Sequence, residues 1–230
     1  MTDRHLELPS SFAATRDALH TLVELVISPA RAAVAAGEFS LEATPDGFGT
    51  PPLPDGSVIR VEGAELIVQP SAGEERRQSI SSLQAAANFV GLAGVDLDDT
   101  PLKIDGASSL VLGSAFALAN DVLIELRDEA AASADASPIR LWPEHFDIAF
   151  EQGDEAAGQR AGYGLSPGDE AHPEPYFYVG PWQAPADLSE WNAEGFTGAE
   201  LRWNDLLASD DPRSAALAFL RDRRDALQSA

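Results

Sequence analysis

The sequence predicts an α+β fold in which a mostly antiparallel sheet packs against helices. Three observations indicate this class. Apolar residues recur at helical spacing near the N-terminus, strand-like runs flank a two-residue turn at Gly63-Ala64, and a long apolar stretch follows Gly106. The order helix, strands, helix occurs twice along the 230 residues, which indicates a structural pseudo-repeat.

The first element is predicted to be a helix that Ser10 or Ser11 can cap and that runs to about Ala36. Its apolar residues are spaced by three and four positions and therefore share one face. These residues are Leu19, Leu22, Val23, Val26 and Ile27. Pro29 is expected to kink the helix or to split off a second short one, because proline has no backbone N–H to donate. A short strand is expected over residues 39–43.

The next segments are predicted to form a hairpin, after a turn-rich loop over residues 44–56. Strands 57–62 and 65–69 flank a two-residue connection that begins with Gly63, as a type II′ turn prefers. A third strand over residues 76–80 would extend this hairpin.

A second helix is expected over residues 81–90, because serines at its start can cap it and a glycine directly after it can end it. The acidic segment Asp96–Pro101 is the best internal boundary. Because this segment is short, we expect one α+β domain over residues 1–230, with halves 1–95 and 101–230.

The second half is predicted to open with a helix over residues 107–129, which is apolar nearly all round and therefore buried. Residues 138–151 alternate as a strand does, residues 151–174 are rich in loop formers, and residues 176–182 form a second strand. A polar stretch is then expected to cross the surface before a last helix opens at Pro212.

The charge of the chain disfavours two classes of partner. There are 38 acidic and 15 basic residues, which gives a formal net charge of −23. Such a field repels phosphate backbones and anionic lipid, so we expect no nucleic-acid partner and no membrane partner, while a basic protein partner stays open. The only basic cluster, Arg221, Arg223 and Arg224, is expected to be a solvated helix face.

The absence of cysteine excludes disulfides, thiolate nucleophiles, iron–sulfur clusters and cysteine-based zinc sites. The first residues lack the pattern of a secretory signal. The most apolar run, Gly106 to Asn120, has 15 residues, whereas a membrane span needs about 20. The sequence therefore predicts a soluble, cytoplasmic protein.

Common catalytic motifs are missing. The chain contains no phosphate-binding loop ending in Gly-Lys-Ser/Thr, no dinucleotide-binding glycine motif, no Gly-x-Ser-x-Gly elbow and no His-Glu-x-x-His helix. Whether the protein is an enzyme therefore stays open.

A candidate site lies between residues 141 and 182. His145 and Asp147 are two apart in a predicted strand and are expected to project to one face, where the acidic loop 164–174 can bring His172 or Asp169 over them. An imidazole–carboxylate set of this kind suits a divalent metal, which gives His145, Asp147 and His172 as metal ligands. The wider set of candidate ligand-binding residues is Trp142, His145, Asp147, Asp169, Glu170, His172, Tyr176 and Tyr178.

Three functions stay open on these residues. The first is a protein that binds a small ligand or a divalent metal within residues 141–182. The second is a metal-assisted hydrolase, with Glu170 or Glu174 as the base. The third is a structural or interaction protein, because histidines near carboxylates arise by chance in a chain with 38 acids, and aromatic residues more often belong to the core.

Two motifs carry a resemblance to a known family. They are Leu-Trp-Pro-Glu-His-Phe-Asp-Ile-Ala-Phe over residues 141–150, and Gly-Leu-Ser-Pro-Gly-Asp-Glu followed by Pro-Tyr-Phe-Tyr over residues 164–178. The pair resembles a domain of unknown function found in uncharacterised bacterial proteins. The resemblance implies an N-terminal helix, a hairpin, a long middle helix and a C-terminal aromatic block, and it implies no catalytic residue.

Overall fold

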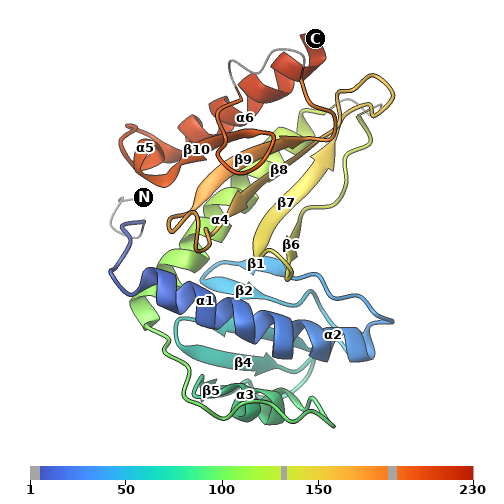
Figure 1. Ribbon diagram of the computed structural model, residues 1–230. Coiled ribbons are helices and arrows are strands. Elements are labelled where there is room, and N and C mark those ends of the chain that lie inside the picture. The colour runs from blue at the N-terminus through green and yellow to red at the C-terminus, as the bar shows by residue number, and fades with distance from the viewer. Residues whose placement is uncertain (1–5, 131–133, 186–190, 230) are drawn as a thin grey trace. The chain divides into compact units, whose positions relative to one another are not determined.

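The computed structural model describes residues 6–130, 134–185 and 191–229. The chain divides into two compact units (Figure 1). The first unit comprises Met1–Ala117 and Leu141–Phe146, and the second comprises Leu118–Arg140 and Asp147–Ala230. The order helix, strands, helix occurs twice, with two antiparallel five-stranded sheets. The predicted α+β class and its pseudo-repeat are therefore confirmed.

The first unit opens with one continuous helical run that changes its hydrogen-bonding pattern ahead of Pro29. Its parts are α1 (Phe12–Leu22), the π-helical turn η2 (Val23–Ile27) and α2 (Ser28–Val34). A π turn widens the helix, which relieves the clash and the missing N–H that proline brings to an α-helix. Ser11 makes no cap, because its hydroxyl hydrogen-bonds to that of Ser108 at 2.9 Å.

The sheet of the first unit has the order β1-β2-β3-β4-β5. Its strands are β1 (Glu42–Thr44), β2 (Gly47–Gly49), β3 (Val58–Glu62), β4 (Glu65–Gln69) and β5 (Arg76–Ser79). The predicted hairpin is confirmed, and Gly63 takes a φ of 55° as its turn requires. Strand β2 lies in the segment predicted as loop. Its glycines are needed because a Cβ at Gly49 would lie 2.5 Å from the carbonyl oxygen of Ile59 in β3.

Two further helices follow the first sheet. They are α3 (Leu83–Val90) and α4 (Gly106–Asp128). The Ser82 side chain caps α3 by accepting a hydrogen bond from the Ala85 N–H at 3.1 Å, and Gly91 ends it with a φ of 78°. Within the first unit, the α4 residue Phe116 packs edge-on against the rings of Phe48 and Phe146.

By length and composition alone, helix α4 could cross a membrane. Among the described residues, it is the one helix that meets these criteria. The sequence analysis judged this segment too short for a membrane span because it counted only the uninterrupted apolar run before Asp121. However, 56% of the most apolar window of α4 is buried inside the protein, which is typical of a core helix.

The second unit is built around a sheet of order β10-β9-β8-β7-β6, with α6 against β9 and β10 (Figure 1). Its elements are β7 (Asp147–Gln152), β8 (Ala161–Ser166), β9 (Tyr176–Pro181), β10 (Ala199–Arg202), α5 (Trp203–Leu207) and α6 (Pro212–Ser229). Of β6 (Arg140–Trp142), only Arg140 belongs to the second unit. The prediction of one continuous strand over residues 138–151 is wrong, because the segment forms two strands, β6 and β7. A turn over residues 143–146 divides it, and Phe146 takes a φ of 54°.

The sequence did not predict three elements of this unit. Strand β8 lies in the segment predicted to be rich in loops, and β10 and α5 lie in the polar stretch expected to cross the surface. Strand β8 was obscured by its two glycines, which are typical of turns. Strand β10 and α5 are too short to show a period.

Candidate functional site

The second unit contains an open pocket of about 650 Å³. Its walls come from the loop of residues 171–175, the start of β9, residues 194–195, β10 and α5. This pocket includes three of the residues that the sequence singled out, His172, Glu174 and Tyr176.

Glu200 of β10 provides a buried carboxylate at this pocket. Its side chain has no exposed surface. One oxygen, Oε1, accepts a hydrogen bond from the Arg202 Nε at 2.8 Å. The other, Oε2, lies 3.4 Å from the His172 Nε2 and makes no hydrogen bond to any described residue. A buried carboxylate with an unfilled acceptor is costly to leave without a partner.

The backbone of Glu200 is held by Asn192. The Glu200 N–H donates to the Asn192 Oδ1 at 3.0 Å, and the Asn192 Nδ2 donates to the Glu200 carbonyl oxygen at 3.1 Å. The carboxylate is therefore positioned by a two-point contact to the segment before β10.

His172 is positioned by Asp169, which organises the loop before β9. The Asp169 Oδ1 accepts hydrogen bonds from the N–H groups of Ala171 at 2.7 Å and His172 at 2.8 Å. The Asp169 N–H donates back to the His172 carbonyl oxygen at 2.7 Å. Asp169 therefore shapes the loop, whereas the next residue, Glu170, is exposed.

An aromatic wall extends from His172 along β9. The His172 ring lies 5.1 Å from that of Tyr176, and Tyr176 and Tyr178 both lie against Phe196. The pKa of Tyr176 is raised above its ordinary value, mainly by burial. The two tyrosines are two apart in one strand and therefore share a face.

Tyr178 connects this wall to Asp147. Its hydroxyl donates a hydrogen bond to the Asp147 Oδ2. Burial raises the pKa of Tyr178 well above its ordinary value, and the negative charge of Asp147 raises it further. The phenol therefore stays a neutral donor, which suits the buried carboxylate that it faces.

The second unit thus brings together most of the predicted ligand-binding residues. They are Asp147, Asp169, His172, Tyr176 and Tyr178. Trp142 and His145 belong to the first unit. Both are exposed, and His145 lies in the turn rather than in the strand that was expected to hold it.

The metal prediction has no counterpart in the geometry of the described residues. In residues 6–130, 134–185 and 191–229, no three histidine, aspartate or glutamate side chains gather as a metal would require. Of the set His145, Asp147 and His172, the first belongs to the first unit and the other two to the second, so this metal site stays a prediction.

The residues that sequence reasoning missed are Glu200, Arg202 and Asn204. They lie in the polar stretch that was expected to cross the surface. The only local signal is the run Ala-Glu-Leu-Arg-Trp over residues 199–203, which places apolar residues at every second position but is too short to predict a strand.

The lining of the pocket is acidic. Glu174, Glu194, Glu200 and Asp205 face a single guanidinium group, that of Arg202. Arg202 is itself paired with Glu200 and with Glu194, whose oxygen lies 3.1 Å away. The excess of carboxylates over guanidinium groups in this lining favours a cationic guest over an anionic one.

Comparisons with known proteins found no relative of this chain. No family model, no curated protein and no solved structure matches the chain. The resemblance to a family of bacterial proteins therefore stays a prediction, and the function is argued from the pocket alone.

Proposed function

We propose that the protein binds a small organic cation, such as an alkyl amine, in the pocket between His172 and Glu200, without chemical turnover. The observation that carries the proposal is the Glu200 carboxylate. It is fully buried, and its Oε2 has no hydrogen bond among the described residues. An ammonium group that reached this oxygen would complete its hydrogen bonding and neutralise its charge.

Two further features support a cation. The four carboxylates of the lining outnumber its single guanidinium, which raises the local concentration of cations. The ring of Tyr176 lies in the same wall, and an aromatic face attracts an organic cation through its quadrupole.

The volume of the pocket suits a small molecule. A size of about 650 Å³ falls inside the range of roughly 300–1,000 Å³ that ligand sites commonly have. The described residues bring no third metal ligand to His172 and Glu200, so the geometry favours an organic cation over metal-assisted hydrolysis.

The test is calorimetric titration of the protein with putrescine, a small diamine, and with 1,4-butanediol, its uncharged analogue. We expect saturable binding of putrescine and none of the diol. Glu200→Gln keeps the shape of the side chain and removes its charge, so it should weaken putrescine binding by about tenfold or more.

The matched control is Glu74→Gln. Glu74 is exposed and belongs to the first unit, so this variant removes the same charge away from the pocket. Its affinity for putrescine should equal that of the unchanged protein. An equal loss in both variants would show that only the overall negative field attracts the diamine, and comparable binding of the diol would show that charge is not recognised.

A further inference from the structure

A second cavity, of about 540 Å³, lies in the second unit and shares no lining residue with the His172 pocket. It is lined by Glu129, Ala130 and Ala134, by residues 152–154 and 159 at the turn between β7 and β8, by Tyr163 of β8 and by α6. Its polar lining includes Glu129, Gln152, Asp154, Gln159, Tyr163 and Arg224.

Gln152 is the unexplained residue of this cavity. It is the last residue of β7 and is only 2% exposed. Neither its Nε2 nor its Oε1 reaches a described residue with the distance and angle of a full hydrogen bond, although the amide lies close enough to the Tyr163 hydroxyl to lower the pKa of that group. A buried carboxamide offers donors and an acceptor at once, and leaving them without full hydrogen bonds destabilises the folded protein. A ligand that fills them would remove this cost.

Tyr163 lies beside that amide. Burial raises the pKa of Tyr163 above its ordinary value, while the positive charge of Arg224 and the Gln152 amide act in the opposite direction. The phenol therefore stays a neutral hydroxyl, which can both donate and accept a hydrogen bond.

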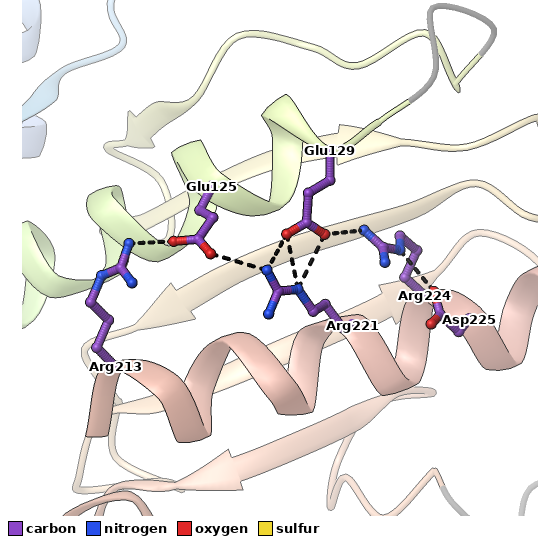
Figure 2. A network of polar contacts seen from close by, with 6 residues as sticks. All are labelled: Glu125, Glu129, Arg213, Arg221, Arg224 and Asp225. Carbon is purple, nitrogen blue, oxygen red and sulfur yellow. Dashed lines mark hydrogen bonds and ion pairs between the residues drawn. The ribbon is translucent and has the colours of Figure 1, made fainter. Parts of the chain in front are cut away.

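Two charged groups of the cavity, Arg224 and Glu129, are paired with each other and with other charged side chains (Figure 2). Arg224 donates to the Glu129 Oε2 at 2.9 Å and to the Asp225 Oδ1 at 3.0 Å. Glu129 also accepts hydrogen bonds from Arg221, whose Nε lies 2.9 Å from its Oε1. The guanidinium of Arg224 is therefore satisfied and offers little to an anionic ligand.

The turn between β7 and β8 gives the cavity a rigid wall. Gly153 takes a φ of 112°, and a Cβ atom there would lie 2.2 Å from the carbonyl oxygen of Gln159. The Gly153 N–H donates to the carbonyl oxygen of Ala134 at 2.7 Å, and the Gln159 N–H donates to that of Asp154 at 2.9 Å. A rigid wall fixes the direction in which Gln152 leaves the strand.

We propose that this cavity binds a small uncharged polyol through the carboxamide of Gln152. Adjacent hydroxyl groups present a donor and an acceptor side by side, which is the pattern that a carboxamide complements. Gln159 and Gln228 add two further amides to the lining, and the pairing of Arg224 with Glu129 and Asp225 disfavours an anionic ligand. The site is independent of the function proposed for the His172 pocket.

The experiment follows the amide signals of the isotope-labelled full chain by nuclear magnetic resonance during addition of myo-inositol, and separately of sodium gluconate. We expect saturable shifts with myo-inositol at the glutamine side chains and at residues 152–163, and none with gluconate. The key variant is Gln152→Met, which keeps the length of the side chain but removes its amide. It should abolish the saturable shifts and, because the unfilled amide is gone, raise the melting temperature.

The matched control is Gln183→Met, which makes the same chemical change at an exposed residue of the second unit. It should bind myo-inositol as the unchanged protein does. The proposal is overturned if the unchanged protein shows no saturable shift, if gluconate binds as well as myo-inositol, or if both variants lose binding equally. A fall in the melting temperature of Gln152→Met would also overturn it, since the amide would then serve the fold. Should that variant not fold, the titrations of the unchanged protein and of Gln183→Met still decide.

Discussion

At Gly164, in the middle of β8, the missing side chain makes room for the phenol of Tyr178. A Cβ atom here would lie 2.8 Å from the Tyr178 hydroxyl oxygen and 2.7 Å from the Ile148 carbonyl oxygen. Both distances are shorter than side-chain carbons tolerate. Because the same hydroxyl donates to Asp147, Gly164 allows the aromatic wall and the buried carboxylate to meet.

The first prediction tests this contact with Gly164→Ala. The added methyl group must displace the Tyr178 ring or a neighbouring strand, so we expect a loss of about 1–3 kcal/mol in the free energy of unfolding, measured by urea denaturation. Gly180→Ala is the control, because nothing lies within 4 Å of a Cβ atom at Gly180. Equal losses in the two variants would mean that the space at Gly164 is not limiting.

The tyrosines give a second prediction at the same scale. Burial raises the pKa of all three tyrosines of the chain, Tyr163, Tyr176 and Tyr178. The folded state therefore favours the neutral phenols. Its stability from this source is fully present below the ordinary tyrosine pKa of about 10 and is lost as the pH rises toward the folded values.

We expect fewer than half of the tyrosines to be ionised at a pH of about 10 while the protein is still folded. The ultraviolet absorbance of tyrosinate measures ionisation, and circular dichroism measures folding. The two changes should occur together as the pH rises further. An ordinary tyrosine titration that is complete before unfolding begins would contradict the prediction.

Between elements of the second unit, an ion-pair network joins α4 to α6 (Figure 2). Glu125 accepts hydrogen bonds from Arg221 at 3.0 Å and from Arg213, and Glu129 binds Arg221 and Arg224. The basic cluster of α6 was expected to be a solvated face. Instead, Arg221 and Arg224 are paired with carboxylates of another helical segment, which explains why a strongly acidic chain keeps them there.

This network predicts a dependence on acid. Hydrogen bonds from Arg221, and then from Arg224, lower the pKa of Glu129 below its ordinary value, although partial burial opposes them. The stability that Glu129 contributes is therefore present above its unfolded pKa of about 4.3 and is lost as the pH falls through the lower folded value.

Glu129→Gln should accordingly lower the free energy of unfolding at neutral pH and make it less sensitive to acid over a pH range of about 5 to 3. Urea denaturation across that range measures both effects. Glu74→Gln is the control, because Glu74 is exposed and outside the network. An acid dependence that is unchanged in Glu129→Gln would show that the ion pairs do not stabilise the fold.

At the scale of the whole molecule, the two units divide within helix α4. Residues up to Ala117 belong to the first unit, and residues from Leu118 belong to the second. The helix places Phe116 in the core of one unit and the buried residues Leu123 and Leu126 in the other. The acidic segment Asp96–Pro101, which was expected to be the boundary, lies inside the first unit.

A shared helix predicts one cooperative unfolding transition. Unfolding of either unit would remove the packing that holds half of α4, and an apolar helix without cover is unstable in water. Differential scanning calorimetry should therefore show a single transition for the full chain. Two well-separated and independently reversible transitions would show that α4 does not couple the units.

The sequence by itself determined the elements that depend on short-range interactions. The turn at Gly63, the capping of α3 by Ser82 and the apolar length of α4 are each decided within a few neighbouring residues. In the candidate site, the sequence pointed to His172, Tyr176 and Tyr178, because an aromatic and acidic loop–strand segment is visible as composition.

The tertiary structure alone decided what these residues meet. Strands β2 and β8 contain glycines, which are typical of turns. The strands need these glycines because neighbouring backbones and the Tyr178 ring leave no room for a Cβ atom. The turn at Phe146 separates His145 from the strand that holds Asp147. Glu200 meets His172 through the pairing of β10 with β9. Pairing between strands depends on contacts between residues distant in the chain, and no local spacing records which strands will be neighbours.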